Sequence, residues 1–117
     1  MVYLSTNLSL AVLEVLVHSP KYALLKEEYV YFTLKIADDF ILKLDEKSLP
    51  EDWNSTTLTT STQLIGDKWL KDKASLALLV PSRIIPVEQN ILLNPRHSDF
   101  AEIKLSGPKS FEFDNRL

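Results

Sequence analysis

The chain has 117 residues, a formal net charge of −3, 45% hydrophobic residues and 25% charged residues. This length and composition predict one folded domain and exclude intrinsic disorder. The basic residues are scattered rather than gathered in a stripe, which disfavours direct binding of nucleic acid. The two glycines cannot form a GxGxxG or GxxxxGK phosphate loop. The absence of cysteine excludes disulfides and thiolate metal sites, and it fits a reducing cytoplasm.

The first part of the chain predicts a strand, a helix and a second strand. Val2 to Leu4 form a short apolar opening that is typical of a strand. Ser5 or Thr6 is expected to cap a helix that runs to about His18. The apolar stretch of that helix is too short to span a bilayer and lacks a basic leader, so we expect neither a membrane span nor a signal peptide. Tyr29 to Ile36 is rich in β-branched and aromatic residues and predicts a strand.

The second half predicts one helix and three further strands. The spacing of Leu64, Ile65, Trp69 and Leu70 indicates an amphipathic helix from Ser61, and both tryptophans, Trp53 and Trp69, are expected in or near the core.

A buried strand follows in the run SLALLVP, which ends at Pro81. Pro86 to Phe100 is expected to be a loop, and two strands are expected near Ala101 to Leu105 and at Phe111 to Phe113, joined through Gly107-Pro108. Strands separated by two helices predict an α+β fold, a single domain around one mixed sheet.

Glu14 is the candidate site residue that the pattern singles out. Its helical neighbours at three and four positions are mostly apolar, so the helix is expected to be buried nearly all round. A buried carboxylate needs a partner, a raised pKa or an aqueous cleft, and each option is compatible with a site. The alternatives are that Glu14 pairs with His18 one turn later or lies on a narrow exposed strip. Periodicity leaves these open.

Other polar residues carry weaker signals. Ser82 follows the buried strand, where a hydroxyl can contact a ligand or can equally cap a turn. The polar run that holds Asn90 and His97 predicts either a binding rim or ordinary turn chemistry around Asn94-Pro95. The spacings of His18 and His97 relative to nearby acids match no metal-ligand motif, so no metal is expected.

Taken together, several segments resemble the RES family. VYLSTNLSLAVLEVLVH is similar to the family's tyrosine-bearing strand and the helix that carries its glutamate. LALLVPSRIIPVEQNILLNPRHSDFAEIKL is similar to its serine strand, its Asn-x-Leu-Leu-Asn-Pro-x-His-x-Asp-Phe run and a closing strand. GDKWL and FEFDNRL resemble a family helix and the family's usual ending. The resemblance therefore extends over nearly the whole chain.

The resemblance implies a fold similar to that of ADP-ribosyltransferases and a toxin that degrades NAD by cleaving its nicotinamide–ribose bond. NAD would be the substrate, and no cofactor is implied. Glu14 and Ser82 match the family's glutamate and serine and would be catalytic, whereas Tyr3, Asn90 and His97 would bind the substrate. The implied partner is an Xre-like helix-turn-helix antitoxin in the cytoplasm, and formation of a homodimer is left open.

The family's arginine has no counterpart in this sequence. In the family it lies upstream, so the resemblance predicts a RES domain over residues 1–117 that lacks the family's N-terminal segment. Two hypotheses follow. An NAD-degrading enzyme requires Glu14 and Ser82 to converge on one cleft although they are far apart in sequence. A catalytically inactive fragment that acts only as a protein-interaction module would bind a partner without NAD turnover.

Overall fold

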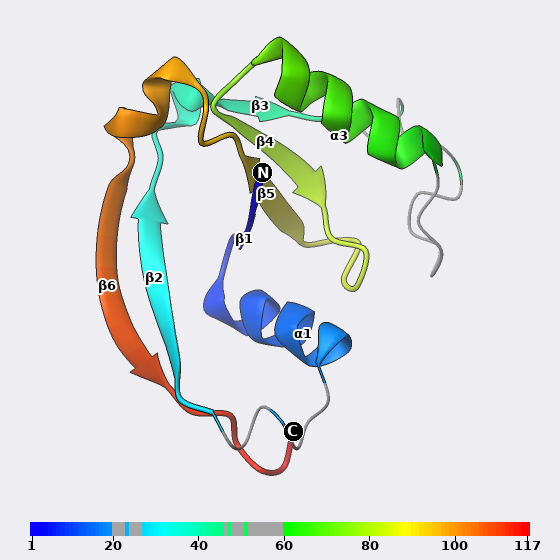
Figure 1. Cartoon of the computed structure of the whole chain (residues 1–117). Helices are drawn as coiled ribbons and strands as arrows, with labels where there is room; N and C mark the ends of the chain where they lie inside the picture. The colour runs from blue at the N-terminus through cyan, green and yellow to red at the C-terminus, as the bar shows by residue number, and fades with distance from the viewer. Residues whose placement is uncertain (20–22, 24–26, 46, 48–50, 52–59) are drawn as a thin grey trace.

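A mixed sheet of four strands forms the centre of the protein, whose computed structural model describes residues 1–19, 23, 27–45, 47, 51 and 60–117 (Figure 1). Its strand order is β1-β5-β4-β3, with bounds β1 Val2–Ser5, β3 Ile41–Lys43, β4 Ala77–Pro81 and β5 Gln89–Leu93. β5 pairs antiparallel with both β1 and β4, and β3 pairs parallel with β4. The predicted α+β class and mixed sheet are therefore confirmed.

β5 corrects one expectation, because it lies inside the segment Pro86 to Phe100 that was predicted to be a loop. Polar residues flank its short apolar run, so its local pattern resembles turn chemistry. In the fold, β1 and β4 supply hydrogen-bonding partners on both of its sides. Pairing in the sheet thus overrides the weak local signal of this segment.

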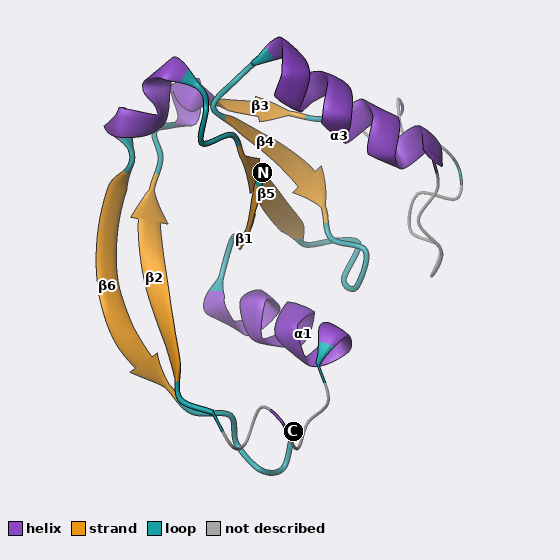
Figure 2. Ribbon diagram, in the orientation of Figure 1, coloured by secondary structure: helices purple, strands orange, loops and turns teal. Residues whose placement is uncertain are grey.

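Helix α3 (Thr60–Asp72) covers one face of the sheet, as predicted from its apolar spacing (Figure 2). Trp69 packs there against Leu78 and Leu92, which lie opposite each other on β4 and β5. The indole Nε1 donates to Ser75 Oγ at 2.8 Å, so its polar atom is satisfied in the core. The expectation for Trp69 is confirmed, whereas Trp53 lies outside the described residues.

The other face of the sheet packs against a second, two-stranded sheet of β2 (Tyr29–Lys35) and β6 (Lys104–Phe111). Leu76, Ala77 and Leu93 form the buried centre of this contact. Partly buried residues from several elements surround them, including Leu34 of β2 and Ile103 before β6. The short helices η1 (Asp38–Phe40) and η3 (Ser98–Glu102) connect the two sheets at the same end, and the β2–β6 ribbon extends away from it (Figure 1).

The strand predicted at Tyr29 to Ile36 is confirmed as β2, but the expectation for the tail was wrong. Two strands joined through Gly107-Pro108 were predicted, whereas β6 is one continuous strand through that dipeptide, and residues 98–102 are helical. A register shift between Tyr31 and Thr33 accommodates the dipeptide, and Gly107 has a φ of 124°. The long pairing with β2 keeps β6 continuous where Gly and Pro would otherwise end a strand.

Helix α1 (Leu8–His18) follows β1 directly, as expected, but its cap and burial differ from the prediction. Asn7, rather than Ser5 or Thr6, caps the helix, because its Oδ1 accepts from the backbone N–H of Leu10 at 2.8 Å. The hydroxyls of the two predicted residues instead bond to β5. Leu10 is the one buried residue of α1, since the helix packs at the end of the sheet beside an open cavity. In the described part of the chain, neither helix has the length and apolarity needed to cross a membrane.

Candidate functional site

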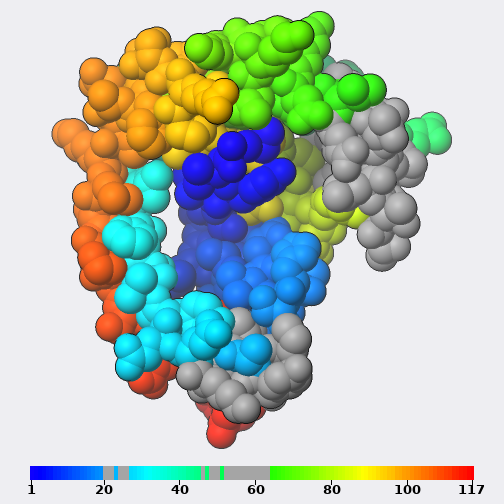
Figure 3. Space-filling view, viewed as in Figure 1, coloured from blue at the N-terminus to red at the C-terminus, as the bar shows by residue number. Residues whose placement is uncertain are grey.

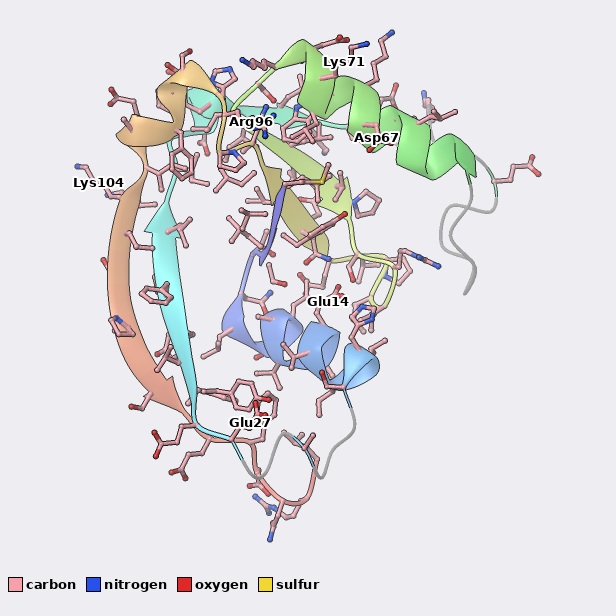
Figure 4. The ribbon with its side chains drawn as sticks, viewed as in Figure 1. Glu14, Glu27, Asp67, Lys71, Arg96 and Lys104 are labelled. Atoms are coloured by element: carbon pink, nitrogen blue, oxygen red, sulfur yellow. The ribbon has the colours of Figure 1, made fainter. Side chains whose placement is uncertain are left out.

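The carboxylate of Glu14 is the centre of a polar cluster at the end of the sheet. On α1 this half-buried side chain lies toward the sheet (Figure 4). Its Oε1 accepts a hydrogen bond from Asn90 Nδ2 at 2.8 Å and another from Ser82 Oγ at 3.2 Å. These donors are 76 and 68 residues away along the chain. Glu14 and Ser82 therefore meet, as predicted, but of the two only Glu14 lines the cavity described below.

Two interpretations of Glu14 that the sequence left open do not describe it. Among the described residues, the ion pairs within 4 Å are His97–Asp99 and Arg116–Asp114, so Glu14 does not pair with His18. The side chain is also not on an exposed strip, since it lies against polar groups of two other elements. The sequence required a partner, a raised pKa or an aqueous cleft for this carboxylate. The structure provides hydrogen-bonding partners and a cavity.

Ser82 is completely buried immediately after β4. Its Oγ accepts from the backbone N–H groups of Ile84 at 3.1 Å and Ile85 at 3.2 Å, while it donates to Glu14. The serine is therefore both a turn-capping residue and a member of the Glu14 cluster. Because this side chain has no exposed surface, its hydroxyl contacts Glu14 but cannot contact a ligand in solvent.

Asn90 reaches Glu14 from the middle strand of β1, β5 and β4. In the register of the sheet it lies opposite Ser5 of β1 on one side and Val80 of β4 on the other. Ser5 Oγ donates to Asn90 Oδ1 at 3.0 Å. The sequence did not identify Ser5 as a site residue. Its only local signal was a possible helix cap, and its contact with Asn90 depends on strand register.

Tyr3, Glu14, Asn90 and Ser5 line a cavity of about 1610 Å³. The cavity is larger than the roughly 300–1,000 Å³ of a typical small-molecule site. It opens between β2 and the N-terminal residues, where Figure 3 shows a gap between the cyan and blue atoms. Tyr3 and Ser5 are two positions apart on β1 and therefore project on the same face. The Tyr3 side chain is 74% exposed and available to a ligand in this cavity.

His97 is not among the residues that line the cavity. It precedes η3, where its Nδ1 accepts from the backbone N–H of Asp99 at 3.0 Å, and it lies 3.6 Å from Asp99 Oδ2. These contacts brace the segment after β5. Over the described residues, no group of three or more His, Asp or Glu side chains is placed to hold a metal ion.

The sequence of this chain, including the residues of the Glu14 cluster, is similar to a known protein family. The model of the RES domain family matches residues 1–114. The chain is 43% identical to "Toxin Res" of Yersinia enterocolitica, over 99% of this chain and 76% of that protein. It is 41% identical to "Toxin Res" of Photorhabdus laumondii, over 99% of this chain and 74% of that protein. A "Prs ADP-ribosylating toxin" of Sphingobium is 29% identical over 99% of this chain and 73% of its own length.

Proposed function

Because this chain belongs to the RES domain family, we propose that it is a toxin that degrades NAD by cleaving the bond between nicotinamide and ribose. The observation that carries the proposal is the Glu14 carboxylate, held by two neutral donors at the edge of a cavity. The names of two relatives, both called Toxin Res, support a toxin. The name of the third, an ADP-ribosylating toxin, supports chemistry at the same bond of NAD.

In the proposed reaction, the bond between ribose C1′ and the nicotinamide nitrogen breaks. Nicotinamide leaves with the electron pair of that bond, and C1′ develops oxocarbenium character. A carboxylate beside the ribose stabilises this positive charge, which is the part we assign to Glu14. Water or phosphate then donates an electron pair to C1′ and loses a proton. Either acceptor yields an ADP-ribose product.

Other residues of the cavity would bind the substrate. The exposed ring of Tyr3 offers a surface for the nicotinamide end. Arg83 also lines the cavity, and its guanidinium would complement the negative diphosphate of NAD. We assign Ser82 to positioning of Glu14 rather than to contact with substrate, because its side chain is buried. His97 would act on the site only through the segment that it braces.

Release of nicotinamide from NAD by the purified chain tests the proposal. Glu14→Gln is expected to abolish release, because the amide is isosteric but lacks the charge that stabilises the ribose cation. Glu102→Gln is the matched control, since it is the same substitution at an exposed position outside the cavity, and it should retain wild-type release. Circular dichroism of both variants would verify that the fold is unchanged.

The outcomes separate the hypotheses. Release that persists in Glu14→Gln would contradict the role of Glu14. No release by the wild-type chain, with water or phosphate as acceptor, would contradict NAD cleavage and favour a protein-interaction module without catalysis.

We extend the proposal to a type II toxin–antitoxin system, in which an Xre-like helix-turn-helix protein neutralises the toxin in the cytoplasm. The names of the Yersinia and Photorhabdus relatives support a toxin. A toxin that acts inside the cell that makes it requires a neutralising partner. Expression of the chain should arrest growth and lower cellular NAD, and co-expression of a helix-turn-helix protein encoded beside it should restore both. Growth arrest with an unchanged NAD level would contradict the proposed mode of toxicity.

A further inference from the structure

We infer that Ser5 and Asn90 form a positioning relay that fixes Oε1 of Glu14 and leaves Oε2 for the substrate. This inference rests on the proposed function for its catalytic consequence. Its structural basis is independent, since the hydrogen bonds run in one direction, from Ser5 Oγ to Asn90 Oδ1 and from Asn90 Nδ2 to Glu14 Oε1.

The chemistry of the groups fixes the direction of the relay. A carboxylate can only accept hydrogen bonds, so the Asn90 amide must turn its NH₂ toward Glu14. Its Oδ1 then faces Ser5 and accepts a hydrogen bond from the Ser5 hydroxyl. With the amide reversed, Oδ1 would lie against the Glu14 oxygen and the NH₂ against Ser5. The Glu14 carboxylate thus selects the amide orientation, and the Ser5 hydroxyl, which can donate or accept, stabilises that orientation by donating to Oδ1.

The two carboxylate oxygens have different surroundings. Asn90 and Ser82 both donate to Oε1, from β5 and from the end of β4. In the described part of the chain, no hydrogen bond reaches Oε2. Two donors, one on β5 and one just after β4, define the position of Oε1, which restricts rotation of the carboxylate. Oε2 is therefore the oxygen available to a ribose in the cavity that Glu14 lines.

Strand pairing in the sheet, rather than a loop, positions the two residues of the relay. Ser5 and Asn90 are direct partners in the antiparallel pair of β1 and β5, where opposite side chains lie close together. α1 begins three residues after Ser5, so one short segment carries both Ser5 and Glu14. A carboxylate mounted on regular elements is held more accurately than one on a loop.

Steady-state kinetics of the full chain tests the catalytic consequence. Asn90→Ala should lower kcat about 10- to 100-fold, the range for loss of a hydrogen bond to a charged group. Ser5→Ala should lower kcat about 3- to 10-fold, because it removes a neutral hydrogen bond one step away. In both variants KM should change less than about 2-fold, since the relay acts on the transition state. Ser5→Thr keeps the hydroxyl on a residue suited to a strand, so its kcat should be close to that of the wild-type chain and above that of Ser5→Ala.

Thr6→Ala is the matched control. Thr6 Oγ1 donates to the carbonyl of Gln89 at 3.0 Å, so this variant also removes a hydrogen bond between β1 and β5. It leaves the Glu14 cluster intact and should keep wild-type kcat. A loss of kcat in Thr6→Ala equal to that in Ser5→Ala would overturn the relay. A rise of KM at constant kcat in Asn90→Ala would also overturn it, because Asn90 would then be a substrate-binding residue.

Nuclear magnetic resonance provides a readout that does not require NAD cleavage. In the full chain, the side-chain amide protons of Asn90 should shift upfield in Glu14→Ala and change in Ser5→Ala, with little change in Thr6→Ala. If the wild-type chain does not cleave NAD but these shifts occur, the proposed function fails while the relay stands. An Asn90 amide that responds to neither Glu14→Ala nor Ser5→Ala would overturn the relay itself.

Discussion

Ser82 shows how one residue can serve both the local turn and the candidate site. Its oxygen accepts from two backbone N–H groups, of Ile84 and Ile85, and donates to the Glu14 carboxylate. A hydroxyl can do both at once because it carries one donor and two acceptor positions. The two interpretations that the sequence offered for Ser82 therefore describe one geometry.

Ser82→Ala is expected to lower the free energy of unfolding by about 1–3 kcal/mol, because the N–H groups of Ile84 and Ile85 lose their acceptor in a part-buried place. Urea denaturation followed by circular dichroism measures this change. Ser110→Ala is the control at an exposed strand position and should change stability by less than about 0.5 kcal/mol. Equal stability of Ser82→Ala and wild type would show that water replaces the serine hydroxyl.

At the scale of elements, the two glycines occupy opposite kinds of position. Gly66 lies inside α3, and a Cβ built there meets only Met1 Cε at 3.8 Å, an ordinary contact. Gly107 in β6 has a φ of 124°, and a Cβ there would lie 3.0 Å from the carbonyl oxygen of Tyr31. The helix tolerates glycine, whereas the β2–β6 pairing requires it.

Gly66→Ala is therefore expected to raise the free energy of unfolding by about 0.5–1 kcal/mol, because alanine is the better helix former. Gly107→Ala should lower it by at least about 1 kcal/mol, because a side chain is strained at this backbone conformation. Thermal unfolding of both variants provides the comparison. A lower melting temperature for Gly66→Ala would mean that α3 packs more closely at Gly66 than the structure indicates.

At the scale of the molecule, the four-stranded sheet is packed on both faces. α3 contributes Trp69 to one face, and the β2–β6 sheet contributes Leu34 to the other. Neighbouring residues of β5 serve the two sides, since Leu92 belongs to the first cluster and Leu93 to the second. A two-stranded sheet is marginally stable alone, so β2 and β6 depend on the second cluster.

Leu93→Ala is expected to cost about 2–5 kcal/mol, the usual range for truncating a buried leucine. The loss should also reach β2 and β6, whose amide protons should exchange faster with solvent. Leu105→Ala, at a side chain that is 62% exposed, is the control and should cost far less. Protection of β2 and β6 that is unchanged in Leu93→Ala would show that the second sheet is stable without this cluster.

Local pattern predicted the elements whose signals lie within themselves. β2 was visible in its aromatic and β-branched residues, α3 in its apolar spacing, and β4 in its continuous apolar run. β5 and the continuity of β6 were missed, because each depends on a partner strand far away in the sequence. The resemblance of ordered motifs to the RES family was also readable from the sequence, and the family match confirmed it.

The sequence by itself determined that Glu14 is an unusual residue, because a carboxylate on an apolar helix needs an explanation. It could not decide among an ion pair, an exposed strip and a site. The tertiary structure decided this, since Asn90 and Ser82 reach Glu14 from 76 and 68 residues away. Ser5 acquires its role in the same way, through its pairing with Asn90. The physical reason is that the pairing of β1 with β5 and the packing of α1 against the sheet set which side chains meet, and both join segments that are far apart in the sequence.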